Sequence, residues 1–133
     1  MKTIIKNGRV IDPSQMTDRV ADIVVEYGMI KAVTEPSGAA GSAADDADEI
    51  IDATGMWVVP GLIDTHVHFR EPGLEYKEEI RTGCLAAAAG GFTAVCTMPN
   101  TKPFVDSVET VEYIKEREAA ANGVKLLQSA CIT

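Results

Sequence analysis

The sequence has little of what builds disulfide frameworks, secreted precursors or membrane spans. Its three cysteines, Cys84, Cys96 and Cys131, are odd in number and irregularly spaced, which is typical of reduced thiols in a cytosolic protein. No apolar run approaches the roughly 18 residues of a membrane span. The first residues alternate between apolar and polar side chains and include a predicted turn, so they lack the continuous apolar stretch of a signal segment. These absences predict a soluble, cytoplasmic chain without a membrane partner.

Basic residues are also scarce, with 12 lysines and arginines against 20 aspartates and glutamates and a net charge of −8. A nucleic-acid surface needs clustered positive charge, so no nucleic-acid partner is expected. The acidic residues fall in a predicted loop and on predicted helix faces, where they are ordinarily solvated, and we assign them no chemistry. With 46% hydrophobic residues, the chain can still bury a core.

Histidine is rarer still. The two histidines of the chain, His66 and His68, lie two positions apart at the end of an apolar run. Side chains alternate across a strand, so these two imidazoles share a face with Asp64. Two neutral imidazoles on one edge can bind one cation at about 2.0–2.1 Å. A pair with this spacing can also consist of two solvated histidines that bind no metal. The buried-strand pattern before the pair and the Pro-Gly turn after it favour metal ligation.

Asp64 is predicted to orient a metal ligand instead of binding the metal itself. Metal-bound histidines usually donate their second ring N–H to a carboxylate or a carbonyl oxygen, and Asp64 lies two residues before the pair.

Two stretches carry a family resemblance: DTHVHFREPG at residues 64–73, and the run from Glu75 to Pro103 that contains TMPNTKP. They resemble the opening of a dihydroorotase of the amidohydrolase superfamily. The resemblance implies a (β/α)8 barrel in which His66 and His68, at the end of the first barrel strand, ligate a catalytic zinc. It also implies a binuclear zinc site in the complete enzyme.

The same resemblance implies that Arg70 and Asn100 hold the carboxylate of the substrate. Allantoinases tend to carry Asn at the position of Arg70, and hydantoinases generally lack both Arg70 and the MPNT run. A ring that bears a carboxylate suits the planar, always charged donor pair of arginine, and asparagine adds an uncharged hydrogen bond. From the pattern alone, Asn100 between two prolines would be a turn residue.

Residues 1–56 predict an N-terminal β-rich domain, sandwich-like in character. Asn7-Gly8 predicts a type I′ hairpin, and Tyr27-Gly28 predicts a second hairpin. Residues 34–48 are small and acidic and predict a mobile loop, for which peptide binding is the alternative. The expected strands cover residues 3–6, 9–12, 22–26, 29–33 and 50–53.

Residues 57–133 predict alternating strands and helices, so the fold class is α/β, and the resemblance implies that these are the first two or three strands of a (β/α)8 barrel. The expected elements are a strand over 58–68, a helix over 75–89, a strand over 92–98, a helix from Asp106 to Asn122 and a third strand from residue 124. Asp106 and Glu109 predict a capping pair at the second helix. Strand parity places Asn100 at the same carboxyl-end rim as His68.

A complete barrel takes about 250 residues and rarely fewer than 200, so this chain is expected to be the N-terminal portion of a dihydroorotase and inactive alone. The remaining metal ligands and the proton-shuttling aspartate of the family have no counterpart here, and no catalytic residue is assigned within the chain. The reaction implied is hydrolysis of the cyclic amide of dihydroorotate, by a metal-activated hydroxide, to carbamoyl-aspartate and the reverse closure, in pyrimidine biosynthesis.

Two other functions stay open. One is a non-catalytic assembly partner of aspartate transcarbamoylase, although such inactive chains often lose the histidines that are intact here. The other is a cyclic amidohydrolase of allantoinase or hydantoinase type, against which Arg70 and Asn100 argue. The open strands also predict association with other copies or partners, because they leave edges and apolar faces uncovered.

Overall fold

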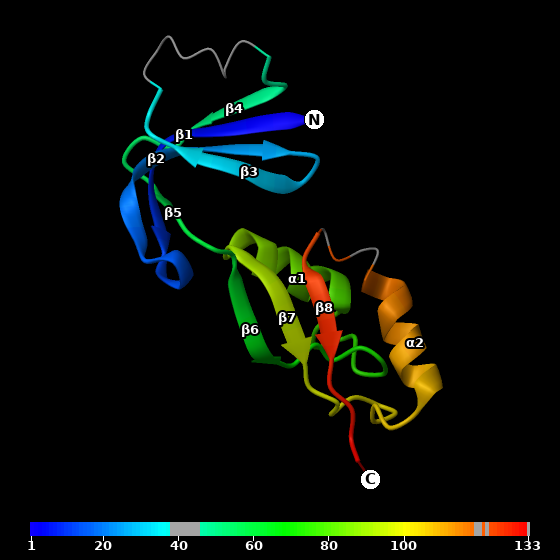
Figure 1. Ribbon diagram of the computed structural model, residues 1–133. Coiled ribbons are helices and arrows are strands. Elements are labelled where there is room, and N and C mark those ends of the chain that lie inside the picture. Colours follow the sequence, from blue (N-terminus) through cyan, green and yellow to red (C-terminus); the bar gives the residue numbers. More distant parts are fainter. Residues whose placement is uncertain (38–45, 119–120, 122, 133) are drawn as a thin grey trace. The chain divides into compact units, whose positions relative to one another are not determined.

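The computed structural model describes residues 1–37, 46–118, 121 and 123–132, and it divides into two compact units, Met1–Pro60 and Gly61–Thr133 (Figure 1). The sequence predicts this division after residue 56. The structure places it after Pro60 because the short strand β5 (Trp57–Val58) pairs with the first strand of the chain and so belongs to the first unit.

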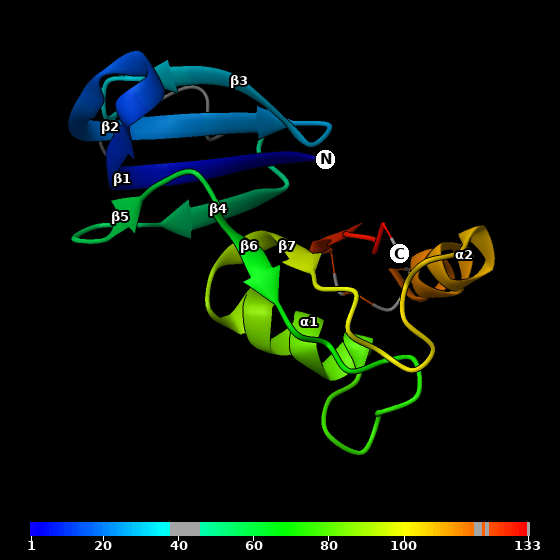
Figure 2. The same ribbon diagram turned by 90° about the horizontal axis from the view of Figure 1, so that it is seen from below.

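The first unit is one mixed sheet in the order β3-β2-β1-β4, with β5 also on β1 (Figure 2). Its other strands are β1 (Lys2–Asp12), β2 (Thr17–Glu26), β3 (Met29–Thr34) and β4 (Glu49–Asp52). The β1–β2 and β2–β3 pairs are antiparallel, whereas β4 and β5 run parallel to β1. A sandwich needs two facing sheets, and the described residues of this unit form a single one.

The predicted hairpin at Asn7-Gly8 is wrong. A type I′ turn requires positive φ at both residues, but only Asn7 adopts it, at 60°. β1 therefore continues through the pair as a bulge, with its register against β2 shifting between Ile5 and Gly8. The chain reverses instead at the short 3-10 helix η1 (Pro13–Gln15).

The hairpin predicted at Tyr27-Gly28 is confirmed. Tyr27 has φ 52° and Gly28 has φ 74°, and Glu26 pairs with Met29 across the turn. β4 likewise matches the strand expected over 50–53. Of the loop predicted over 34–48, residues 38–45 lie outside the described part of the chain.

The second unit is a parallel sheet in the order β6-β7-β8 with two helices (Figure 1). Its elements are β6 (Leu62–Val67), α1 (Ile80–Ala89), β7 (Phe92–Thr97), α2 (Val108–Arg117) and β8 (Lys125–Gln128). Side chains of both helices share one buried cluster with β7 and β8, so both helices cover the same face of the sheet. That cluster includes Ile80, Cys84, Val95, Ile114 and Leu126. This is the strand–helix alternation expected of a barrel's beginning.

Several strand and helix boundaries differ from those predicted. The strand expected over 58–68 is split between β5 and β6, with Pro60 and Gly61 between them. α1 begins at Ile80 instead of residue 75, because the Pro-Gly turn at 72–73 is followed by a second turn at 75–77. The predicted Asp106 cap is wrong. Ser107 is the N-cap of α2, and its hydroxyl accepts a hydrogen bond from the Thr110 amide at 3.3 Å.

α2 ends at Arg117, earlier than predicted, and the predicted end at Asn122 lies outside the described residues. In the described part of the chain, no helix combines the length and the apolar character needed to cross a membrane.

Candidate metal and carboxylate site

The two histidines lie at the carboxyl end of β6. His66 is the fifth residue of that strand and His68 follows its end, and both are exposed. Their ring centres are 5.1 Å apart and their planes are inclined by 61°. Two imidazoles bound to one tetrahedral cation at about 2.0–2.1 Å have ring centres about 5 Å apart, so this pair has the spacing of a shared ligand set.

A bulge in β6 includes His66, the first histidine of the pair. Asp64 pairs with Val95 and Val67 pairs with Thr97, so β6 holds one residue more than β7 over this interval. The Asp64 carboxylate accepts a hydrogen bond from the backbone N–H of His66 at 2.9 Å, which stabilises the bulged backbone. Bulges re-aim side chains, so simple alternation does not extend through this strand end. The predicted role of Asp64 toward a metal-bound ring stays a prediction.

Asn100 lies beside His68, with its Oδ1 2.9 Å from the His68 Nδ1. The two residues are 32 positions apart and come from the ends of neighbouring parallel strands, β6 and β7. The carboxyl ends of parallel strands meet at one edge of a sheet, which is why the sequence could place them together.

Arg70 follows in the loop after β6 and is half-buried. Its guanidinium has no hydrogen-bond or ion-pair partner among the described residues, so its donors are available to a ligand. Its backbone carbonyl accepts from the Leu74 amide at 3.0 Å, which closes a turn directly after it.

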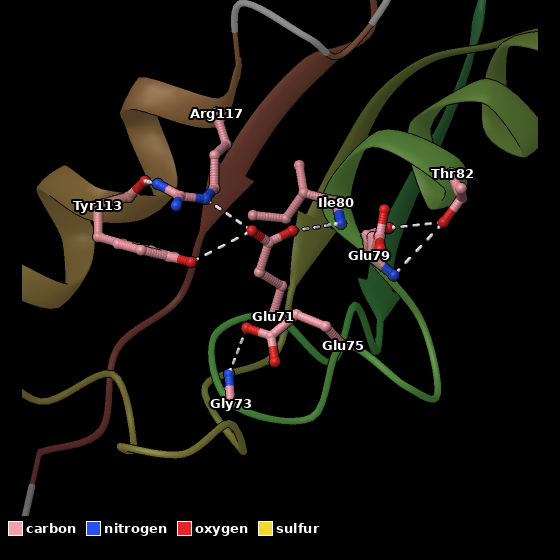
Figure 3. Close-up of polar contacts among 8 residues, drawn as sticks. All are labelled: Glu71, Gly73, Glu75, Glu79, Ile80, Thr82, Tyr113 and Arg117. Atoms are coloured by element: carbon pink, nitrogen blue, oxygen red, sulfur yellow. Dashed lines mark hydrogen bonds and ion pairs between the residues drawn. The ribbon is translucent and has the colours of Figure 1, made fainter.

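The neighbouring Glu71 ties this loop to both helices (Figure 3). One carboxylate oxygen accepts from the Ile80 amide at 2.9 Å, at the start of α1. The other accepts from the Arg117 Nε at 2.6 Å and from the Tyr113 hydroxyl at 3.3 Å, both on α2. Only 13% of the Glu71 side chain is exposed, so this carboxylate is largely removed from water.

The cation partner of Glu71 is itself held in place. The Arg117 Nη1 donates to the Tyr113 carbonyl at 3.1 Å, and the guanidinium carbon lies 3.3 Å from the centre of the Tyr113 ring. Burial raises the pKa of the Tyr113 phenol, which keeps it a protonated donor toward Glu71.

The opposite side of the loop is fixed at Gly73. Its amide donates to the Glu75 carboxylate at 2.6 Å, and this bond lowers the pKa of that carboxyl (Figure 3). Gly73 has φ 86°, and a Cβ there would overlap the Lys102 carbonyl, so only glycine fits this approach of the two loops. Sequence reasoning missed Glu71 and Arg117, because 46 positions separate them and neither stands in a recognisable pattern.

The described residues contain no group of three or more His, Cys, Asp or Glu side chains placed to hold a metal. The structure therefore offers two imidazole donors, a neighbouring amide and a nearby guanidinium at one sheet edge.

Residues 55–133 match a family model described as dihydro-orotase-like. The chain belongs to this dihydroorotase-like family. The dihydroorotase of Trichlorobacter lovleyi is 49% identical over 133 residues, which are all of this chain and 30% of that protein. The chain thus spans about a third of the length of the curated dihydroorotases it matches.

Solved structures agree on the fold. The L-hydantoinase (dihydropyrimidinase) of Arthrobacter aurescens matches with a TM-score of 0.71 and 28% identity, over 89% of this chain and 24% of that one. An atrazine chlorohydrolase mutant of Arthrobacter aurescens TC1, complexed with zinc, matches with a TM-score of 0.67 and 22% identity, over 96% of this chain and 35% of that one. Both matches show that this chain shares their fold over most of its length.

Proposed function

We propose that this chain forms the first part of a zinc-dependent dihydroorotase, which hydrolyses the cyclic amide of dihydroorotate to carbamoyl-aspartate and catalyses the reverse closure. The observation that carries the proposal is the 2.9 Å contact between Asn100 and His68. It brings a predicted carboxylate-binding residue against a predicted metal ligand, as hydrolysis of a ring that bears a carboxylate requires.

His66 and His68 would hold one cation of a binuclear zinc site. When bound, the zinc supplies Lewis-acid activation of water and of the amide carbonyl. Arg70 binds the substrate carboxylate through its planar donor pair, and Asn100 adds an uncharged donor beside it. The proton shuttle belongs to residues outside this chain.

The resemblance extends the proposal to the cellular setting: a cytoplasmic enzyme of pyrimidine biosynthesis that forms homo-oligomers. Aspartate transcarbamoylase is the candidate protein partner. Co-purification of the native protein with that enzyme would test this part separately, and its failure would contradict only the partner assignment.

The experiment that tests the function measures the intact mass, the zinc content and the hydrolysis of dihydroorotate for the native protein. We expect a mass well above the 14.2 kDa of this chain, bound zinc and turnover of dihydroorotate. The 133-residue chain alone serves as the control and should not turn over, because it supplies only two imidazole donors.

Hydantoin and allantoin are the competing substrates in the same assay. Preferred turnover of either one would contradict the assignment of Arg70 and Asn100 to a carboxylate. Dihydroorotate hydrolysis by the 133-residue chain alone would contradict its predicted inactivity.

A further inference from the structure

The contact between Asn100 and His68 also bears on which ring nitrogen of His68 carries a proton. The Asn100 Oδ1 is a hydrogen-bond acceptor, so this contact pairs with a His68 that carries its proton on Nδ1. A neutral imidazole has one protonated nitrogen, and the other then keeps its lone pair. In this arrangement the free lone pair of His68 lies on Nε2.

We propose that Asn100 is a positioning residue for His68 as well as a substrate-binding residue. Its carbonyl oxygen holds the ring in the Nδ1–H tautomer and presents Nε2 to a cation, while its amide nitrogen stays available to the substrate carboxylate. The tautomer is inferred from the contact between the Asn100 Oδ1 and the His68 Nδ1. The roles toward zinc and carboxylate rest on the proposed function.

The backbone on both sides of the contact is well anchored. His68 is followed by Phe69, which is buried and packs so closely on Gly83 of α1 that a Cβ there would overlap its ring. Asn100 is followed by Thr101, which is 2% exposed and donates its hydroxyl to the Pro103 carbonyl at 2.7 Å. Each partner thus stands next to a buried residue, which preorganises the pair.

Backbone hydrogen bonds add to this anchoring. The Met98 amide donates to the Val67 carbonyl at 2.9 Å, joining the ends of β6 and β7 directly before the two side chains. The Val105 amide donates to the Pro99 carbonyl at 3.1 Å and closes the loop that carries Asn100. A ring held at such a strand end needs only a fixed acceptor to define its orientation, and Asn100 supplies it.

Two substitutions separate the two roles. Asn100→Asp keeps an oxygen that accepts from the His68 Nδ1–H, but it loses the N–H donors and places a negative charge beside the substrate carboxylate. Asn100→Ala removes both functions. Asn100 is exposed, so both variants should fold, which a backbone amide spectrum compared with that of the wild type would verify.

The first test uses long-range ¹H–¹⁵N NMR spectra of the native protein, labelled with ¹⁵N at histidine and stripped of metal, at pH 8.5. We expect His68 as the Nδ1–H tautomer in the wild type and in Asn100→Asp, and a shift toward the Nε2–H tautomer in Asn100→Ala. His66 serves as the internal control and should not change. A wild-type His68 that carries its proton on Nε2 would overturn the inference.

The second test titrates the native protein, stripped of metal, with zinc alone. Loss of a residue that orients a metal-bound histidine typically costs about 10–100-fold in metal affinity, and we expect this loss in Asn100→Ala. Asn100→Asp should bind zinc at least as tightly as the wild type, yet lose dihydroorotate binding through a raised KM. Unchanged zinc affinity in Asn100→Ala would overturn the positioning role even if dihydroorotate is the substrate. Conversely, absent turnover with the expected tautomer and zinc results would contradict only the proposed function.

Discussion

Among individual residues, Glu71 shows how a single carboxylate holds the loop after β6. It joins the segment after β6 to the first residue of α1 and to two side chains of α2. Arg70 stands directly before it, so the position of the predicted carboxylate-binding guanidinium depends on this anchor.

Removal of this anchor should destabilise the second unit. Glu71→Ala leaves the Ile80 amide and the Arg117 guanidinium without their acceptor, which should lower the free energy of unfolding by about 1–3 kcal/mol. We place the loss in the lower part of that range because the Arg117 side chain is 36% exposed and water replaces part of the pairing. Urea denaturation would measure it. The control, Glu116→Ala at an exposed position of α2, should change stability by no more than about 0.5 kcal/mol.

Asp22 in the first unit predicts a defined pH dependence. It is 1% exposed and accepts from the Asn7 amide at 2.9 Å and from the Ser37 amide and hydroxyl at 2.9 and 2.7 Å. Burial acts to raise the pKa of the Asp22 carboxyl, but these hydrogen bonds hold it below its usual value. Its stabilising contribution is therefore present above the unfolded-state pKa and is lost as pH falls through the folded-state pKa.

Asp22→Asn should therefore unfold more easily at pH 7 and lose less stability than the wild type on acidification below about pH 4. Urea midpoints measured from pH 7 to pH 2.5 would show this difference. Glu26→Gln, on the same strand, is the control and should retain the wild-type acid dependence. Parallel curves for Asp22→Asn and the wild type would contradict the assigned role.

The candidate site could be predicted from sequence where its residues follow strand ends. The meeting of His68 and Asn100 needed only the rule that neighbouring parallel strands end at the same sheet edge, whereas the bulge at His66 could not be foreseen from strand alternation. The contacts of Glu71 could not be predicted in this way, because they depend on the length of α2 and on the packing of Arg117 over Tyr113.

Among the elements, the two dipeptide turns of the first unit show why local patterns can mislead. Asn7-Gly8 is the strongest hairpin pattern in the chain, yet β1 continues through it because β2, β4 and β5 all pair with that strand. Tyr27-Gly28 is a weaker pattern, and it forms the hairpin. Pairing of a central strand with three partners outweighs the local preference of one dipeptide.

A substitution at Tyr27 should therefore stabilise this turn. Tyr27 is 85% exposed and adopts φ 52°, a conformation that costs most residues about 1–2 kcal/mol and asparagine less. Tyr27→Asn should raise the free energy of unfolding by up to about 1 kcal/mol, measured by urea denaturation. Tyr27→Val is the matched comparison and should lower it, because a β-branched residue is strained at positive φ. A stabilised valine variant would argue against this turn geometry.

The whole chain consists of two units, and each leaves apolar surface uncovered. A hollow of about 670 Å³ in the first unit is lined mainly by aliphatic side chains, among them Ile5, Val10, Ile23, Val25 and Val33. In the second unit, Leu62 is 48% exposed, Ile63 63% and Leu127 43%. Uncovered apolar surface and open strand edges favour pairing with another chain.

We therefore expect the isolated 133-residue chain to self-associate at micromolar concentration. Sedimentation velocity over a range of concentrations would detect self-association as an apparent mass that rises with the loading concentration. Ile63→Lys should reduce association, whereas Glu112→Lys, on the exposed surface of α2, makes the same final residue elsewhere and should not. A monodisperse monomer at every concentration would contradict this expectation.

The class of the whole fold could be predicted because helices and strands alternate after residue 57 and strands dominate before it. The single-sheet form of the first unit could not, because strand pairing over long sequence distances decides it. β4 and β5 follow β1 only after β2 and β3, and no local pattern shows that both pair with β1.

The adjacency of Arg70 and Glu71 bears on how such enzymes diversify. Glu71 points its carboxylate toward the helices and stabilises the loop, whereas the guanidinium of Arg70 has no partner in the described part of the chain. If Arg70 binds the substrate carboxylate as proposed, a point mutation there would alter the choice of substrate at little cost in folding, because its neighbour retains the loop. A family built on this arrangement could then acquire new substrates while its scaffold stays unchanged.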